Sequence, residues 1–147
     1  KFLLKEDLPL SLLKEGVVYV QAYLNKDPER TVRVRVAGEK AFLTIKGKTS
    51  NASRLEFEYE IPVKEAWDLM SLAVLPPIYK KRYQVKYASH TWEIDVFEKE
   101  NEGLIVAEIE LESIDEMVDF PLWIGEEVTG DVRYYNLCLA EKPYSKW

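Results

Sequence analysis

Basic side chains recur at every second position in several stretches of this 147-residue sequence. Arg33 and Arg35 alternate with valines, and Lys80 and Arg82 show the same spacing. Because successive side chains of a β-strand point to opposite faces, each pair lies on one face of its strand. Arg presents a planar fork of donors that matches phosphate oxygens, and Lys presents a mobile positive charge, so the pattern predicts a phosphate site. The candidate phosphate-binding residues are Arg33, Arg35, Lys46, Arg54, Lys80 and Arg82.

Acidic side chains follow the same two-residue spacing in other stretches. Glu108 and Glu110 form one such pair, and Glu93 and Asp95 form another. Hard divalent cations prefer carboxylate oxygens, whereas one histidine and one cysteine are too few for a zinc cluster. We therefore expect Mg²⁺ or Mn²⁺ as the cofactor, with the remaining acids paired to Lys and Arg. The candidate metal ligands are Glu108, Glu110, Asp95, Glu93, Glu56 and Glu58.

Alternation of polar and apolar residues predicts the strands that must position these side chains. Gly38-Glu39 suits a tight hairpin between two of the strands, and residues 48–53 are expected to form a polar connection. The expected strands lie near 2–4, 17–24, 31–37, 40–46, 54–61, 78–88, 91–98 and 104–112.

Two segments depart from the strand pattern and are predicted as helices. Residues 63–73 place apolar side chains, Trp67 among them, on one helical face, with prolines at both ends. Ser113 is expected to cap a short second helix that ends at Pro121. The length and composition fit a single domain over residues 1–147.

The charges are sorted by strand, and this sorting bears on the shape of the sheet. One expected strand has only basic residues on its polar face, while others have almost only acids. An antiparallel sheet with one solvated face would also alternate, but such a face usually mixes its signs along each strand. A closed sheet with the charges inside suits a polyphosphate and divalent cations, because buried charges need partners. We therefore expect an α+β, predominantly β fold: an eight-stranded antiparallel closed barrel with a polar lumen and a few flanking helices.

Composition limits the remaining classes of function. A net charge of −6 argues against a nucleic-acid partner. No apolar run is long enough to span a bilayer, so no membrane partner is expected. A single cysteine permits no internal disulfide, which favours a cytoplasmic location. The sequence holds neither a Ser-His-Asp arrangement nor the glycine-rich loops of the common nucleotide-binding folds.

Several blocks of the sequence, taken together and in their order along the chain, match the pattern of one protein family. They include 33–35 (Arg-Val-Arg), 43–47 (Leu-Thr-Ile-Lys-Gly), 92–97 (Trp-Glu-Ile-Asp-Val-Phe) and 107–111 (Ala-Glu-Ile-Glu-Leu). In these blocks the sequence resembles the CYTH family, which includes bacterial inorganic triphosphatases, thiamine triphosphatases and one class of adenylate cyclase. The resemblance covers nearly the whole chain and implies the eight-stranded triphosphate tunnel fold.

The resemblance also assigns roles that the alternation alone does not. The family's first strand carries Glu-x-Glu-x-Lys; only its last residue is present here, as Lys1, and we expect the two acids to precede it. Lys1 and Arg133 are implied to be phosphate-binding residues. Tyr23 lies in a matching block and is expected to reach the lumen near Lys80, where the two would polarise the attacking water or the leaving oxygen.

Attack of water on a terminal phosphoryl group is the chemistry that such residues support, through positioning and charge neutralisation. The resemblance implies metal-dependent hydrolysis of inorganic triphosphate to diphosphate and phosphate. The alternatives are a thiamine or nucleoside triphosphatase, an adenylate cyclase that uses the same tunnel, and a polyphosphate-binding module without catalysis. We also expect a homodimer, because the apolar outer face exceeds what two helices can cover.

Overall fold

The computed structural model describes residues 1–5, 7–50 and 53–147. In these residues the chain forms one antiparallel sheet, two α-helices and short 3₁₀ turns. The strands are β1 (Phe2–Leu4), β2 (Val17–Tyr23), β3 (Thr31–Ala37), β4 (Lys40–Ser50), β5 (Ser53–Ile61), β6 (Ile78–Tyr87), β7 (His90–Phe97), β8 (Ile105–Glu108) and β9 (Ile124–Glu127). The helices are α1 (Val63–Met70) and α2 (Asn136–Glu141).

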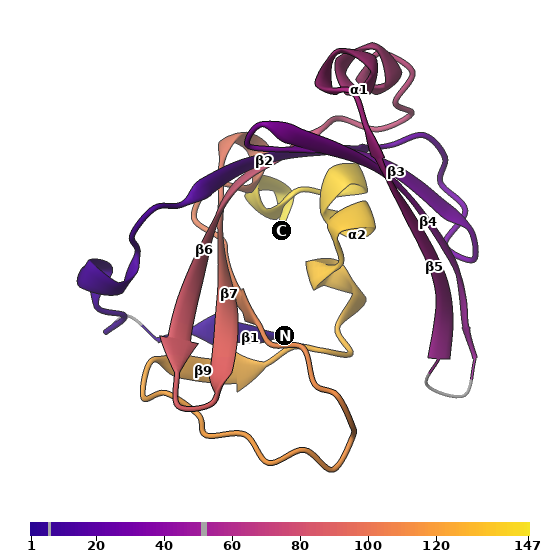
Figure 1. The fold of residues 1–147 in the computed structure, drawn as a ribbon. Helices are drawn as coiled ribbons and strands as arrows, with labels where there is room; N and C mark the ends of the chain where they lie inside the picture. Colours follow the sequence, from indigo (N-terminus) through magenta and orange to yellow (C-terminus); the bar gives the residue numbers. More distant parts are fainter. Residues whose placement is uncertain (6, 51–52) are drawn as a thin grey trace.

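The sheet curves into an arch (Figure 1). Its strand order is β5-β4-β3-β2-β6-β7-β8-β1-β9, so that β5 and β9 are its two edges within the described part of the chain. The eight expected strands are all present, and β9 is additional, since four residues that include Gly125 hold too little alternation to predict a strand. The predominantly β, antiparallel character of the fold is confirmed, whereas closure into a barrel is not.

The two connections around β4 differ in how well the sequence predicts them. The β3–β4 hairpin forms as expected, with Ala37 opposite Lys40 and Gly38 at a φ of 60°. The expected polar connection at 48–53 is instead largely strand, since β4 continues to Ser50 and β5 begins at Ser53. A register shift between Lys46 and Thr49 lets the pairing continue through these polar residues. Asn51 and Ala52 lie outside the described residues.

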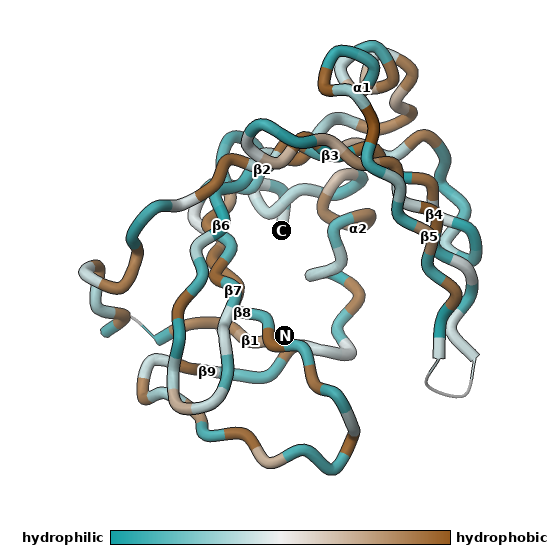
Figure 2. Tube along the Cα trace, in the orientation of Figure 1, coloured by the Kyte–Doolittle hydropathy of each residue, from teal (hydrophilic) through white to brown (hydrophobic). Residues whose placement is uncertain are grey.

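The two faces of the arch carry different side chains, as the alternation predicts. On the convex face, Val34 and Ala41 pack with Ala66 of α1. Farther along the sheet, Trp92 and Ile94 are fully buried on the same face. Hydrophilic and hydrophobic residues accordingly alternate along the strands in Figure 2. The polar members of the alternation therefore line the concave face.

Helix α1 covers the convex face of β3 and β4 and begins directly after Pro62. Ala66 is its buried residue, and Leu69 and Met70 pack beside it. Trp67, which was expected on the same apolar face, is 47% exposed. The buried face centres on Ala66 and its i+3 and i+4 neighbours, which turns Trp67 away from the sheet.

The second helix forms at a different place from the one expected. The segment that begins at Ser113 consists of bends and turns. There the Glu116 carboxylate accepts a hydrogen bond from the backbone N–H of Glu112, and Oε1 lies 2.7 Å from His90 Nε2. These contacts hold the segment as a loop against the β6–β7 hairpin instead of continuing a helix.

Helix α2 lies on the concave side of the arch (Figure 1). Leu139 is fully buried there in an apolar cluster with Ile78 of β6 and Phe97 of β7. This cluster fills part of the concave side, so the lumen is polar along only part of its length. Within the described residues, no helix has both the length and the apolar character needed to cross a membrane.

Candidate active site

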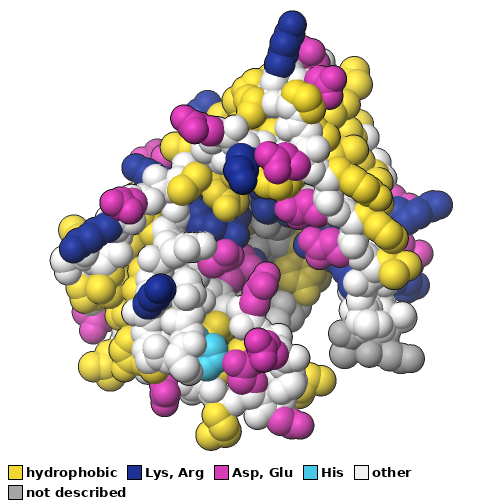
Figure 3. Space-filling view, viewed as in Figure 1, with side chains coloured by type: hydrophobic (Ala, Val, Ile, Leu, Met, Phe, Trp, Pro, Cys, Tyr) yellow, Lys and Arg dark blue, Asp and Glu magenta, His cyan; other side chains and the backbone are white. Residues whose placement is uncertain are grey.

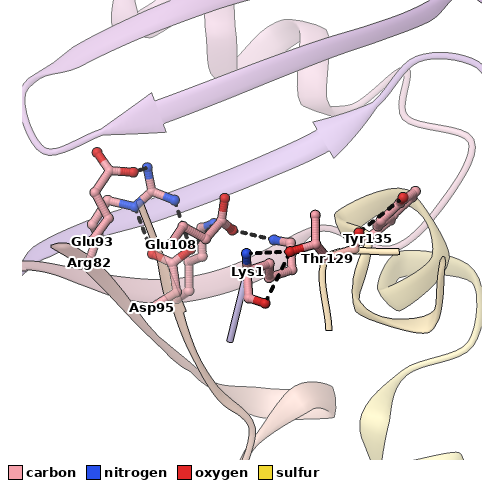
Figure 4. Close-up of polar contacts among 8 residues, drawn as sticks. Lys1, Arg82, Glu93, Asp95, Glu108, Thr129 and Tyr135 are labelled. Atoms are coloured by element: carbon pink, nitrogen blue, oxygen red, sulfur yellow. Dashed lines mark hydrogen bonds and ion pairs between the residues drawn. The ribbon is translucent and has the colours of Figure 1, made fainter. Parts of the chain in front are cut away.

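The concave face of β6 and β7 carries a network of ion pairs. Lys80 and Asp95 are both fully buried, and Lys80 Nζ lies 2.6 Å from Asp95 Oδ2. Arg82 donates to both oxygens of the same carboxylate, from Nε to Oδ1 at 2.7 Å and from Nη2 to Oδ2 at 2.7 Å (Figure 4). Its Nη1 donates to Glu93 at 2.6 Å. Since the register pairs Arg82 with Asp95, the sheet itself aligns these groups.

Burial and neighbouring charges set the protonation of this network. Burial lowers the pKa of Lys80 to about 8 against the opposing effect of Asp95, and the positive charge of Arg82 adds to the decrease. Burial alone would raise the pKa of Asp95, but Lys80 and Arg82 hold it at about 2. Burial also disfavours the charged form of Arg82, yet its contacts with Asp95 and Glu93 raise its pKa. The network therefore stays charged at neutral pH, and Lys80 is its member nearest to losing a proton.

A second group of cations lies on the concave face of β3 and joins the first through Tyr19. Arg35 Nε donates to Gln21 Oε1 at 3.2 Å. The guanidinium carbons of Arg35 and Arg82 lie 5.2 Å and 5.0 Å from the centroid of the Tyr19 ring. Burial, followed by repulsion from Arg33 and Arg82, lowers the pKa of Arg35 to about 10. Positive charge is therefore crowded at this point, and an anion would relieve the crowding.

An open cavity of about 500 Å³ lies between the sheet and α2, with Arg33 in its lining. Arg33 Nη2 lies 3.4 Å from Thr44 Oγ1 on one wall of this cavity. Figure 3 shows Lys and Arg side chains gathered in a hollow at the centre of the molecule, with Asp and Glu along its rim. The lining includes Lys1, Tyr23, Thr31, Arg33, Thr44, Lys46, Arg54, Val132, Tyr135 and Leu137.

Tyr23 lies in this cavity and not beside Lys80. Burial raises the pKa of the Tyr23 hydroxyl, and the positive charges of Arg33 and Arg35 act in the opposite direction. The tyrosine ring next to Lys80 is that of Tyr19, whose centroid lies 6.0 Å from Nζ. In the described part of the chain, the structure records no contact between Tyr23 and Lys80.

Carboxylates on β7 and β8 form the part of the concave face that suits a hard cation. Glu93 and Glu108 lie opposite each other in the strand register. Glu108 also pairs with Lys1 (Figure 4), and although burial favours a higher pKa for this carboxyl, the Lys1 ammonium lowers it. Among the described residues, no group of three or more His, Cys, Asp or Glu side chains is placed to hold a metal ion. The donors still fit Mg²⁺, which commonly binds one or two carboxylates and takes its other ligands from water and substrate phosphates.

Two of the expected site residues lie away from this network. Strand β8 ends at Glu108 and not at residue 112, so Glu110 lies beyond the strand and is exposed. Arg133 stands on a 3₁₀ turn, its side chain is 64% exposed, and it pairs with Asp131. The structure therefore does not bring Glu110 or Arg133 together with the other candidates.

Three further candidates stand together on the opposite arm of the arch, on β5. Glu56 Oε2 lies 3.3 Å from Lys46 Nζ, and Glu58 Oε2 lies 3.3 Å from Thr44 Oγ1. Arg54 donates through Nε to the carbonyl of Gly47 and lines the cavity. These acids therefore contact Lys46 and Thr44 of β4 and lie on a different arm from the carboxylates of β7 and β8.

Neutral polar residues also lie on the concave face of the sheet, and selecting candidates by charge leaves them out. Tyr19 and Gln21 share the concave face of β2 with Tyr23, and Thr44 shares that of β4 with Lys46. The two-residue alternation would place all of them correctly. Only their lack of charge separates them from the candidates that the sequence singles out.

Residues 1–141 match the CYTH domain family. The chain is 47% identical to an inorganic triphosphatase of Acetivibrio thermocellus over 148 residues, covering 100% of this chain and 94% of that protein. An inorganic triphosphatase of Nitrosomonas europaea is 35% identical over 124 residues, 82% of each chain. A crystal structure of an inorganic triphosphatase aligns with a TM-score of 0.69 and 32% identity, covering 94% of this chain and 93% of that one. Because these matches extend along nearly the whole chain, the protein belongs to the CYTH family.

Proposed function

We propose that this protein hydrolyses inorganic triphosphate to diphosphate and phosphate, with Mg²⁺ or Mn²⁺ as cofactor. The observation that carries the proposal is the crowding of cations on the concave face, where the guanidinium carbons of Arg35 and Arg82 lie 5.2 Å and 5.0 Å from the centroid of the same Tyr19 ring. Such crowding favours a bound polyanion. The relatives at 47% and 35% identity, both named inorganic triphosphatases, support the same substrate.

The cations that face the lumen and the cavity would bind the substrate. Arg33 and Arg35 lie on one face of β3, two residues apart, so both guanidinium forks can meet a single phosphate chain. Lys46 lines the adjoining cavity and would hold the next phosphate group. Arg82 is already held by Asp95 and Glu93, so its part is to keep the β6–β7 wall ordered and charged.

Lys80 would neutralise the charge that develops on an oxygen as the phosphoanhydride bond breaks. One of its N–H groups donates to Asp95, and the others can donate to a phosphate oxygen. With a pKa of about 8, its ammonium is protonated at neutral pH and shares its proton readily with an oxyanion. Phosphoryl transfer requires little more of the protein than such positioning and charge neutralisation. Tyr23, beside Arg33, is proposed to orient the attacking water.

A bound divalent cation would neutralise charge between the triphosphate and the carboxylates of the lumen. Glu93 and Glu108 would hold it, since they face each other across β7 and β8. Glu108→Gln is then expected to raise the Mg²⁺ concentration that gives half-maximal activity, and Glu126→Gln, on the exposed part of β9, serves as the control. An unchanged midpoint and rate in Glu108→Gln would exclude this ligand. Glu110→Gln in the same titration tests the remaining expectation for that residue.

A released-phosphate assay tests the proposed reaction directly. Tripolyphosphate, ATP and thiamine triphosphate are compared with Mg²⁺ and with Mn²⁺, and cyclic AMP is measured in the ATP reactions. We expect tripolyphosphate to have the highest kcat/KM and Arg33→Ala to reduce it by about a hundredfold. Tight binding of tripolyphosphate without phosphate release would identify a binding module and overturn the proposal.

An organic triphosphate is a second candidate, because the cavity has an apolar side. Tyr135, Val132 and Leu137 line it opposite the cations of the sheet. Aromatic and aliphatic side chains of this kind can pack against a base or a thiazole ring while the triphosphate enters the lumen. Tyr135→Ala would then raise the KM for ATP and leave the KM for tripolyphosphate unchanged. Equal effects on both substrates would argue against this second candidate.

A homodimer is proposed because the convex face of β4 and β5 leaves Leu55 71% exposed and Phe57 49% exposed. The cytoplasmic location expected from the single cysteine stays a prediction.

A further inference from the structure

Gln21 lies in the middle of the sheet, on the concave face of β2. Its neighbours across the two adjoining strands are Arg35 on β3 and Ile78 on β6. The side chain has 0% exposure, an unusual position for a polar residue. Buried amides are retained where their donors and acceptors find partners. The partners of Gln21 therefore bear on what this part of the lumen holds.

One end of the Gln21 amide is satisfied and the other is not. Oε1 accepts a hydrogen bond from Arg35 Nε at 3.2 Å. Within the described residues, Nε2 has no hydrogen-bond partner. Exchanging the amide oxygen and nitrogen would not solve this, because a guanidinium only donates and would then face a second donor. The contact with Arg35 thus fixes Nε2 as the group without an acceptor.

Arg33, on the neighbouring strand, shows the same deficit. Arg33 is 8% exposed, and its Nε likewise has no partner within the described residues. A buried donor without a partner has lost its hydrogen bonds to water and gained none in return, so two of them on adjoining strands need an explanation. Both are donors, and they lie on the concave face that also carries Arg35, in contact with Gln21, and Arg82, beside the Tyr19 ring. An anion with several acceptor oxygens satisfies both conditions.

We propose that Gln21 is a further substrate-binding residue, which donates a hydrogen bond from Nε2 to an oxygen of the triphosphate chain beside Arg35. The inference rests on the proposed function and adds a neutral donor to its cationic site. A neutral donor suits this position because another cation there would add to the repulsion on Arg35. It also binds only an oxygen that lies in line with its N–H group, which fixes where the chain sits.

The competing account is that Gln21 acts only as the acceptor that positions Arg35. Two substitutions separate the accounts. Gln21→Glu keeps an acceptor for Arg35, and strengthens it by charge, but removes the donor. Gln21→Met keeps the length of the side chain but removes both groups. A donor role predicts that both variants lose affinity and that Gln21→Glu, which also adds a negative charge, loses more. Wild-type affinity in Gln21→Glu is compatible only with a positioning role.

The experiment is calorimetric titration of each variant with inorganic tripolyphosphate, after circular dichroism and thermal unfolding have shown that the variant is folded. We expect Gln21→Met to raise the dissociation constant roughly tenfold or more, and Gln21→Glu to raise it further. Gln84→Met is the matched control, because Gln84 is an exposed glutamine on β6. Gln84→Met should retain the dissociation constant that the wild-type protein has for tripolyphosphate. Gln21→Leu takes the place of Gln21→Met if the latter does not fold.

The outcomes separate failure of this inference from failure of the proposed function. If the wild-type protein neither binds tripolyphosphate nor releases phosphate from it, both are overturned. If the wild-type protein binds but both Gln21 variants keep its dissociation constant, the role of Gln21 alone is overturned. Wild-type affinity in Gln21→Glu together with loss in Gln21→Met also overturns it, in favour of the positioning role.

Discussion

Lys80 and Asp95 form a fully buried pair, and the removal of one charge leaves the other buried without compensation. Asp95→Asn is therefore expected to lower the free energy of unfolding by about 3 kcal/mol, as measured by urea denaturation at neutral pH. Glu56→Gln is the control, because it removes the partner of the partly exposed Lys46. That change should cost less than about 1 kcal/mol. Equal losses in the two variants would contradict the importance of burial.

We expect Lys80 to make the proposed substrate binding depend on pH. In the free protein its pKa is about 8, and a bound polyanion raises it by favouring the ammonium. Between the free and the bound pKa, binding takes up a proton, so affinity falls as the pH rises through this window. We expect the dissociation constant for tripolyphosphate to rise about tenfold from about pH 7.5 to about pH 9.5, as measured by calorimetry.

Two variants identify Lys80 as the source of this dependence. Lys80→Met should weaken binding of tripolyphosphate at neutral pH. It should also reduce the slope of the logarithm of the dissociation constant against pH. Lys46→Ala should weaken binding at every pH and leave the slope as it is in the wild-type protein. If Lys80→Met keeps the full slope, the titrating group belongs to the substrate or to another residue.

Among the elements, the β3–β4 hairpin depends on the backbone at Gly38, whose φ is 60°. A side chain in this left-handed region costs about 1–2 kcal/mol. A Cβ at Gly38 would also lie 3.2 Å from Val17 Cγ1. Gly38→Ala should therefore lower the free energy of unfolding by about 1 kcal/mol or more. Thermal or urea unfolding measures the difference.

Gly130→Ala provides the matched control for the hairpin. A Cβ at Gly130 would meet no atom within 4 Å, and its φ is not positive. The change should leave stability unaltered or raise it by about 0.5 kcal/mol, because alanine restricts the unfolded chain. A similar loss in both variants would show that the cost does not come from the left-handed conformation.

For the whole molecule, coverage of the convex face is uneven. Segments before β2 and after β8 cover Trp92 and Ile94 with Leu12, Leu13 and Trp123. Hydrophobic side chains remain open over β4 and β5, as the yellow band on the right of Figure 3 shows. The exposed fractions there are 38% for Ile45, 71% for Leu55, 49% for Phe57 and 55% for Tyr59.

The proposed homodimer would cover this surface. Sedimentation at micromolar concentration should give twice the 17.2 kDa mass of one chain. Phe57→Asp should restore the monomer mass, because a carboxylate would then be buried at the centre of the contact. Met117→Asp, at a residue 89% exposed in the loop after β8, should leave the dimer intact. A wild-type protein that sediments as a monomer would exclude this assembly.

The sequence by itself determined which side chains share a face of the sheet. Alternation along a strand is a local property, so Arg33 and Arg35 could be assigned to the concave face without coordinates. The apolar period between Pro62 and Pro76 likewise predicted α1, because helical spacing is also local. The same rule would have placed Gln21 correctly, and only its neutrality kept it out of the candidate site.

Only the tertiary structure decided which partner each charge has and where the strands end. The bidentate contact of Arg82 with Asp95 depends on the register between β6 and β7, which alternation does not encode. Glu110 lies outside the site because β8 stops at Glu108, where pairing with β7 ends. The open edge between β5 and β9 depends on contacts between residues far apart in sequence, and so does the place of α2 on the concave side. Such contacts arise from packing of the whole chain, and no local pattern of residues specifies them.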